Sequence, residues 1–304
     1  MATKILVTGA SGFLGWNFCQ AFSKQYDIVG TYFRNQPDDL AIEWVRINLL
    51  ETPQIIKLIK KEQPDLVVHL AAISNAAFCE QHPALSHHIN VYTTIALAEA
   101  SKTVGIPMIF ASTDLVFNGN SAPYAEDDFC YPLSQYGQQK QMAEETLLGD
   151  FDHVFVARFP VLFGAAPVYS HNFFTNSLTK LQNLEPIQAF TDEYRSMISG
   201  QVASEWLHRL IDYSLNNVIT DKERLFHLGG SERLSRYDWA MKMATIFDLE
   251  KSFVEPVLQA DLDLFPARPA DVSMDSSLAM RVLEFTPPTM ERQFLELKEK
   301  IAYR

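Results

Sequence analysis

The segment Gly9-Ala-Ser-Gly-Phe-Leu-Gly15 stands near the amino end of the chain, directly after the short apolar run at residues 4–8. Glycines at this spacing allow a tight turn, a close approach of backbone to phosphate, and close packing of a helix on a strand. The helix that follows would add unpaired N–H groups and a partial positive charge. The segment therefore predicts a dinucleotide-binding loop, with an ordinary glycine-rich turn as the alternative. The residues expected to line the loop are Gly9, Ser11, Gly12, Phe13, Leu14 and Gly15.

Strand-like and helix-like stretches alternate through the first half of the chain. Five runs rich in Val, Ile, Leu and Phe show little polar alternation, as buried parallel strands do. These predicted strands cover residues 4–8, 27–32, 66–69, 108–112 and 154–159. Amphipathic stretches lie between them, at about residues 13–25, 53–62, 84–104 and 134–148. The alternation predicts a Rossmann-type α/β fold, a doubly wound parallel sheet with helices on both faces.

The alternation of strands and helices becomes less regular after about residue 160, where prolines divide the chain into shorter pieces. We therefore expect residues 1–160 to form the cofactor-binding Rossmann domain. Residues 161–304 are expected to form a smaller substrate-binding region over the carboxyl ends of the strands, closing a cleft. A segment at about 192–215 is expected to return to the first domain.

Composition excludes several classes of function. The net charge is −12, and the 25 Lys and Arg residues are dispersed, so nucleic-acid binding is not expected. No apolar run approaches the roughly 18 residues that span a bilayer. The amino end lacks the features of a signal peptide, and Cys19, Cys79 and Cys130 are too scattered for a disulfide framework. A cytoplasmic location is therefore the default expectation.

Cys79, His82, His87 and His88 lie within ten residues and suggest a metal site. The Cys-x2-His spacing is only half of a zinc signature, and no second pair follows it. No bound metal is expected.

The choice of dinucleotide depends on the end of the second predicted strand. NAD-binding proteins usually carry an acid about 20 residues past the glycine loop, where it binds the ribose 2′-hydroxyl. Here the segment Gly30-Thr-Tyr-Phe-Arg34 has no acid until Asp38. Arg34 could pair with a 2′-phosphate, which favours NADP. NAD stays open, because Arg34 could instead be a solvated loop residue.

Tyr136 and Lys140 stand four residues apart, on one face of the expected helix 134–148. A free tyrosine has a pKa of about 10, and a neighbouring ammonium favours the phenolate and so lowers that pKa. This would bring the hydroxyl closer to general acid–base chemistry at neutral pH. None of the other tyrosines has a lysine at the same spacing. The pair is therefore the candidate for proton transfer next to a nicotinamide.

Hydroxyl and carboxyl side chains follow the predicted strand 108–112. Ser112, Thr113 and Asp114 stand at its carboxyl end, where open α/β sheets bind their ligands. Thr113 could hydrogen-bond a substrate carbonyl; capping or turn chemistry is the alternative role.

These motifs stand in the order of the extended short-chain dehydrogenase/reductases. The chain resembles dTDP-4-dehydrorhamnose reductase and its relatives in the glycine loop, in His69-Leu-Ala-Ala72, in the segment after Thr113 and in the Tyr136–Lys140 motif. The resemblance implies NADPH-dependent reduction of the C4 ketone of a nucleotide-linked deoxysugar. It implies the catalytic residues Thr113, Tyr136 and Lys140, the cofactor-binding residues Arg34, Asn48, Leu49, Leu70, Ala71, Ala72 and Asn90, and the substrate-binding residues Asp114, Val161 and Arg268. Asn90 matches the position that supports a water and the lysine. Relatives often dimerise through helices beside the active site, which leaves a homodimer open.

The chain departs from this family at two positions. Asn48 stands where an acid usually contacts adenine, although an amide can still hydrogen-bond there. Val161 stands where the rhamnose reductases generally have a tryptophan that packs on the sugar. The segment from Arg158 to Gly164 is more similar to the regulatory β subunit of methionine adenosyltransferase, which binds NADP. The sequence thus supports two functions, a sugar-nucleotide reductase and an NADP-bound regulatory subunit, and the intact Tyr136–Lys140 pair favours the reductase.

Overall fold

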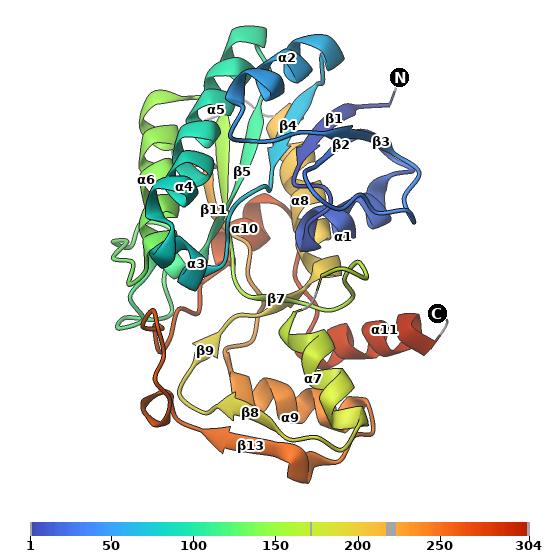
Figure 1. Ribbon diagram of the computed structural model, residues 1–304, viewed down its shortest axis with the longest axis vertical. Coiled ribbons are helices and arrows are strands. Elements are labelled where there is room, and N and C mark those ends of the chain that lie inside the picture. The colour runs from blue at the N-terminus through green and yellow to red at the C-terminus, as the bar shows by residue number, and fades with distance from the viewer. Residues whose placement is uncertain (1, 171, 217–222, 303–304) are drawn as a thin grey trace.

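A parallel sheet of seven strands occupies the upper half of the molecule in Figure 1. The computed structural model describes residues 2–170, 172–216 and 223–302. The strand order is β11-β6-β5-β4-β1-β2-β3: from β1, the strands β2 and β3 are added on one side and the later strands on the other. Open α/β sheets bind their ligands at the point where the order switches sides, which here lies between β1 and β4. The predicted Rossmann-type fold is thereby confirmed. The strands are β1 Lys4–Thr8, β2 Asp27–Tyr32, β3 Glu43–Arg46, β4 Leu66–His69, β5 Met108–Thr113, β6 Val154–Phe159 and β11 Leu225–His227.

The two faces of the sheet are covered by separate apolar clusters. Successive side chains of a strand point to opposite faces, so in β1 Ile5 and Val7 join one cluster and Leu6 joins the other. Both faces are buried, and this is why the strands read as nearly continuous apolar runs in the sequence. The helices that complete the first cluster are α1 Phe13–Phe22, α8 Gly200–Asn216 and α10 Ser277–Val282. Those that complete the second are α2 Thr52–Glu62, α5 Thr93–Val104 and α6 Gln135–Asp150.

Two edge strands and one helix break differ from the sequence expectations. β3 and β11 have four and three residues, too few to show a periodic pattern. The expected helix 84–104 consists of α4 (Pro83–His87), a π-helical turn η1 (His88–Tyr92) and α5. Such turns insert an extra residue into a helix and are frequent at functional sites. Here the inserted turn contains the buried Asn90.

The second group of elements lies below the sheet in Figure 1, beyond the point where β6 leads into β7. Its core is aromatic: the ring centroid of Trp239 lies 5.3 Å from that of Phe163 and 5.3 Å from that of Phe294. Three two-stranded sheets surround this core. The strands are β7 Leu162–Phe163, β8 Ile187–Phe190, β9 Tyr194–Arg195, β10 Ile198–Ser199, β12 Leu234–Ser235 and β13 Val254–Val257. The helices are α7 Phe173–Gln182, α9 Arg236–Ile246 and α11 Met290–Ala302.

A buried ion pair fastens α6 to β6. Arg158 Nε donates to both carboxylate oxygens of Glu144 at 3.1 Å, and Arg158 Nη2 donates to Glu144 Oε2 at 2.7 Å. Both side chains are almost completely buried. Arg158 Nη1 also donates to His227 Nε2 at 3.1 Å, which links the pair to the edge strand β11. The guanidinium therefore sits in the interior with its charge balanced mainly by the Glu144 carboxylate.

Replacing Glu144 with Gln should lower the free energy of unfolding by about 3–5 kcal/mol, because Arg158 would stay buried without its counter-charge. The matched control is Glu145→Gln, at the exposed next position, which should change that free energy by less than about 0.5 kcal/mol. Urea denaturation at pH 7 measures both values. A small loss of the same size in both variants would contradict the role of the pair.

Candidate active site

The turn between β1 and α1 can be built only with glycine at two positions. Gly9 has a φ of +71°, and a Cβ at this position would lie 2.7 Å from Ala71 N. A Cβ on Gly15 would lie 2.4 Å from Gly9 O, closer than packed atoms can come. Gly12 N donates to Gly9 O at 2.9 Å and closes the turn. The glycine spacing thus brings α1, the turn and the segment after β4 into direct contact.

The start of α1 has the properties of an anion-binding site. Its N-cap is Gly12, which has no side chain to cap the helix, and the first turn contains no acidic residue. A Cβ on Gly12 would meet only Gly9 O within 4 Å, so the space in front of the helix is open. The N–H groups of Phe13 and Leu14 belong to the first turn, where a helix offers no acceptor. These features fit the pyrophosphate of a dinucleotide.

Of two further predicted cofactor segments, one lies beside this loop and the other follows β3. Leu70 N donates to Thr8 O at 3.1 Å, which places Leu70, Ala71 and Ala72 next to the turn. In the other segment, Leu50 N donates to Asn48 Oδ1 at 3.2 Å, and Leu49 O accepts from the Thr93 hydroxyl at 2.9 Å. The Asn48 side chain therefore stabilises the turn that follows β3.

Arg34 follows β2 on the surface, and its guanidinium lies 5.8 Å from the ring of Phe33. A second arginine lies close by: Arg46 pairs with Tyr32 across β2 and β3, and its Nε donates to Phe33 O at 3.2 Å. The sequence analysis missed Arg46 because β3 was not predicted. The end of β2 thus has two cations where NAD-binding proteins usually place an acid.

Tyr136 and Lys140 lie one turn apart on α6 and face the end of β5. Ser134 caps the helix, accepting from Gly137 N at 3.2 Å. Lys140 Nζ donates to Ala111 O in β5 at 2.7 Å and lies 4.1 Å from the ring centroid of Phe110. An ammonium has three donors, so two remain for other groups. This donor set fits the hydroxyls of a cofactor ribose.

The pKa of Tyr136 differs from the sequence expectation. Burial raises it above the ordinary value, and the nearby Asp114 and Cys79 raise it further, while a hydrogen bond with the Thr113 hydroxyl acts in the opposite direction. The prediction that Lys140 lowers this pKa is therefore wrong. Burial also lowers the pKa of Lys140 to about 7, which weakens its charge. The phenol stays protonated at neutral pH and is suited to donate a proton.

Thr113 and Asp114 form the turn that ends β5. The Thr113 hydroxyl accepts from Leu115 N at 3.2 Å, which is the capping role given as the alternative, and lies 3.2 Å from Asp114 Oδ1. Asp114 is buried, and its Oδ2 lies 3.8 Å from Arg195 Nε, too far for a hydrogen bond. Burial raises the pKa of Asp114 to about 6, although Arg195 and the Thr113 hydroxyl oppose the rise. The Thr113 hydroxyl can therefore cap this turn and also contact the Tyr136 hydroxyl.

Three arginines converge on one buried glutamate in the lower wall of the site. Glu193 lies 2.8 Å from Arg236 Nε, 3.4 Å from Arg268 Nη1 and 3.6 Å from Arg195 Nη2. Burial opposes the charge of Glu193, but the three guanidiniums hold its pKa below the usual value. The sequence analysis named only Arg268 of this group. The others come from β9 and α9, and no local motif connects them.

Two further predicted residues lie apart from the proton-transfer pair. The Asn90 side chain donates to Gln139 Oε1 at 2.8 Å, so it contacts the residue before Lys140 rather than Lys140 itself. Val161 follows β6, and its side chain packs against the aromatic core of the second group of elements. It is half-buried at the junction of the two groups.

The described residues hold neither a metal site nor a membrane-spanning helix. Within the described ranges, no three or more His, Cys, Asp or Glu side chains are placed to hold a metal ion. The Cys79 thiol donates instead to Ile73 O at 3.3 Å. None of the helices in residues 2–170, 172–216 and 223–302 is long and apolar enough to cross a membrane.

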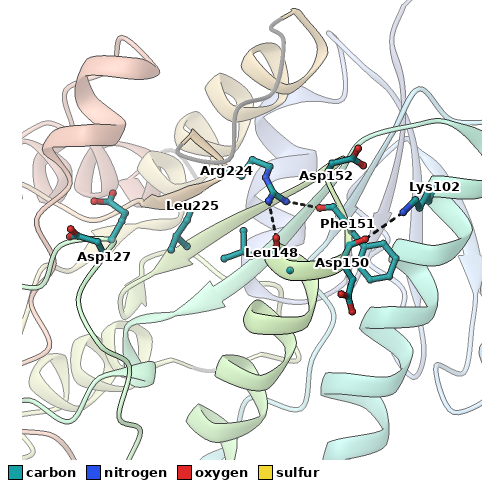
Figure 2. A pocket seen from close by; sticks show the side chains of 10 residues that line it. Lys102, Asp127, Leu148, Asp150, Phe151, Asp152, Arg224 and Leu225 are labelled. Atoms are coloured by element: carbon teal, nitrogen blue, oxygen red, sulfur yellow. Dashed lines mark hydrogen bonds between the residues drawn. The ribbon is translucent and has the colours of Figure 1, made fainter.

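A groove of about 900 Å³ runs beside the edge strand β11 and the carboxyl end of α6. Figure 2 shows that its wall is held by Arg224, which donates to Leu148 O at 2.8 Å and to Phe151 O at 2.6 Å, and by Lys102, which donates to Asp150 O at 3.4 Å. None of the predicted site residues lines this groove. The glycine loop, the segment Leu70–Ala72 and Thr113 lie at the carboxyl ends of β1, β4 and β5, and we place the candidate site there.

The strand order of the parallel sheet switches sides between β1 and β4, and a tyrosine–lysine pair lies on the helix after β5. Together these features define the class of this protein as an extended short-chain dehydrogenase/reductase. Within this class, the chain belongs to the family described as RmlD substrate binding domain, whose model matches residues 3–302.

The chain is similar to proteins of two kinds. It is 28% identical to methionine adenosyltransferase 2 subunit beta of Bos taurus, over 90% of this chain and 80% of that protein. It is 26% identical to the probable low-salt glycan biosynthesis reductase Agl14 of Haloferax volcanii, over 96% of both chains. Among solved structures, dTDP-4-dehydrorhamnose reductase of Bacillus anthracis in complex with NADP matches with a TM-score of 0.85 and 22% identity, over 99% of this chain and all of that one. That match shows the shared fold.

Lys140 should make stability depend on pH. Its folded pKa of about 7 lies below the ordinary lysine pKa of 10.5, so the unfolded chain binds more protons between these two pH values. Burying Lys140 therefore costs no folding free energy above pH 10.5, where the lysine is neutral in both states. The cost grows as the pH falls toward 7, because the unfolded chain keeps a proton that the folded protein does not. The change in the free energy of unfolding caused by Lys140→Met should be more favourable at pH 6.5 than at pH 9.5, as measured by urea denaturation. The exposed control Lys60→Met should show no such difference, and a pH-independent effect of Lys140→Met would contradict the lowered pKa.

Proposed function

We propose that the protein is an NADPH-dependent reductase that acts on the 4-keto group of a nucleotide-linked deoxysugar. The observation that carries this proposal is the convergence of Thr113, Tyr136 and Lys140 at the carboxyl end of β5, beside the glycine loop. A protein that only binds a nucleotide has no physical need for a buried phenol next to a lysine. The solved relative in complex with NADP and the glycan biosynthesis reductase support the same class of reaction.

Each of the three residues has a separate role in this proposal. NADPH, when bound in the cleft, would supply the hydride to the carbonyl carbon. Tyr136, which is protonated at neutral pH, donates its proton to the carbonyl oxygen as that oxygen becomes an alkoxide. Thr113 orients the carbonyl oxygen toward the phenol. Lys140 uses its remaining N–H donors to hold the ribose next to the nicotinamide.

The cofactor would lie along the carboxyl ends of β1, β2 and β4, with NAD as the alternative to NADP. Its pyrophosphate would face the start of α1, and its 2′-phosphate would pair with Arg34, next to Arg46. The residues proposed to bind it are Gly9, Ser11, Gly12, Phe13, Leu14, Gly15, Arg34, Asn48, Leu49, Leu70, Ala71, Ala72, Asn90, Tyr136 and Lys140.

The substrate would lie between the two groups of elements. The three arginines carry one more charge than the two carboxylates of Glu193 and Asp114. This local positive charge, in a protein with a net charge of −12, favours a phosphate-bearing substrate. Asp114, Val161 and Arg268 are the proposed substrate contacts. We also propose the division into residues 1–160 and 161–304, with 192–215 returning to the first part, to which β11 and α10 also contribute. A cytoplasmic location and a place in dTDP-rhamnose biosynthesis belong to the same proposal.

A second function is an NADP-bound regulatory subunit without turnover. It is favoured by the 28% identity to methionine adenosyltransferase 2 subunit beta and by Val161, which stands where the rhamnose reductases generally have tryptophan. The two functions share the cofactor and differ in whether the phenol transfers a proton. A homodimer stays a prediction under either function.

Mixing the protein with NADPH and dTDP-4-dehydro-L-rhamnose should lower the absorbance of NADPH. In Tyr136→Phe, turnover should fall by about 10²- to 10⁴-fold, the usual contribution of a general acid, because the proton donor is removed. The NADPH dissociation constant of this variant, measured by fluorescence, should change by less than about threefold, since the ring is retained. Equal turnover in both proteins would refute the role of the phenol. Absence of turnover in the unmodified protein, with tight NADPH binding, would favour the regulatory subunit.

Arg34→Ala should weaken the binding of NADPH far more than the binding of NADH, because only NADPH has a 2′-phosphate for the guanidinium to pair with. The loss for NADPH should be about 10-fold or more, as a charge-assisted hydrogen bond contributes about 1.5–3 kcal/mol. Titration calorimetry with both cofactors gives the two dissociation constants. An unchanged ratio between them would remove the assignment of NADP.

A further inference from the structure

A buried chain of hydrogen bonds centred on His69 passes beneath the candidate site. His69 ends β4 and is 1% exposed. Its Nδ1 lies 2.6 Å from Thr8 Oγ1, and its Nε2 lies 3.0 Å from Thr94 Oγ1. Thr8 is the last residue before the glycine loop, and Thr94 stands on α5. The imidazole therefore joins the end of β1 to α5.

The donor and the acceptor of every hydrogen bond around His69 can be deduced. The Thr94 hydroxyl has one hydrogen, which it donates to Asn90 O at 2.9 Å, so it must accept from His69. His69 Nε2 then carries the proton, and Nδ1 accepts from the Thr8 hydroxyl. Burial lowers the pKa of His69 to about 3, so the ring is neutral at physiological pH. The imidazole is thus held as one tautomer, with a donor and an acceptor that are both in use.

One arm of the chain leads to the glycine loop. Thr8 precedes Gly9 directly, and its hydroxyl lies within 3.4 Å of Ala71 N. Gly9 itself lies against Ala71, where no Cβ would fit. The bond between Thr8 and His69 therefore fixes the position of the loop relative to the segment after β4.

The other arm leads to the helix of the proton-transfer pair. Asn90, in the π-helical turn η1, accepts from Ile73 N at 2.8 Å and donates to Gln139 Oε1 at 2.8 Å. Gln139 is 3% exposed, donates to Ser86 Oγ at 2.8 Å and stands immediately before Lys140 on α6. The position of α6 thus depends on the turn at Asn90, which Thr94 and His69 hold.

We propose that His69 is a positioning residue with two separable effects. Through Thr8 it sets the glycine loop and hence the affinity for the dinucleotide, and through Thr94 and Asn90 it sets α6 and hence the rate of the chemical step. A fully satisfied polar chain in a core specifies one arrangement of the elements that it joins. The effect on rate rests on the proposed reductase function, and the effect on affinity does not.

Two substitutions of His69 separate the arms. In His69→Asn, the amide oxygen takes the place of Nδ1, which keeps the bond from Thr8 and loses the bond to Thr94. In His69→Gln, the amide nitrogen takes the place of Nε2, which keeps the bond to Thr94 and loses the acceptor for Thr8. His69→Asn should lower kcat about 5- to 10-fold, the effect of one hydrogen bond, and leave the NADPH dissociation constant within about twofold. His69→Gln should raise that dissociation constant about 5- to 10-fold and leave kcat at saturating NADPH within about twofold.

Isosteric variants repeat the test without changing His69. Thr94→Val should reproduce the effect of His69→Asn, and Thr8→Val that of His69→Gln. The control is Ser101→Ala, a buried α5 hydroxyl that donates only within its own helix, to Leu97 O; it should change neither quantity. Losses of equal size in kcat and affinity in all four variants, or no loss in any of them, would overturn the proposal.

Hydrogen exchange provides a readout that needs no turnover. His69→Asn and Thr94→Val should speed amide exchange in the first two turns of α6, while His69→Gln and Thr8→Val should speed it in residues 9–15. If the unmodified protein does not reduce the keto sugar, the proposed function fails, and the dissociation constants and exchange rates still decide this proposal. Exchange that rises in both regions for every variant would overturn it.

Discussion

The Lys140 ammonium donates to the Ala111 carbonyl of β5, and this bond holds α6 against the central strand. Thr113 stands two residues further along β5, and Tyr136 stands one turn earlier on α6, so the same bond brings the two hydroxyls together. The buried pair Arg158–Glu144 fastens α6 a second time, to β6. The geometry of the site therefore follows from how one helix is attached to two neighbouring strands, and the second group of elements adds the lower wall.

Burial decides the electrostatics of this site. The family pattern pairs a tyrosine with a lysine because a cation favours phenolate, but in the folded chain desolvation of both groups outweighs that attraction. The phenol keeps its proton and the ammonium loses part of its charge. Such a pair is suited to the direction of reduction, in which the oxygen of the substrate gains a proton. The similarity to a regulatory subunit and to a glycan biosynthesis reductase shows that the same scaffold occurs in both kinds of protein.

The central strands and the glycine loop could be predicted because their causes are local. Runs buried on both faces are apolar at most positions, and the turn at Gly9 and Gly15 excludes any Cβ. β3 and β11 could not be predicted, since a three- or four-residue edge strand has no period to detect. The arginine group around Glu193 and the chain through His69 and Gln139 were missed for another reason. Their members are far apart in the sequence and meet only through tertiary packing.

A crystal structure of the protein with NADP would test the central claim most directly. We expect the nicotinamide ring at the carboxyl end of β5, with the Tyr136 hydroxyl facing the ring and Lys140 Nζ within hydrogen-bond distance of the ribose. The substrate carbonyl would then fit between the phenol and the ring at about 3–3.5 Å from each. A nicotinamide bound away from β5, or a Tyr136 hydroxyl turned into the core, would contradict the account and leave only a nucleotide-binding fold.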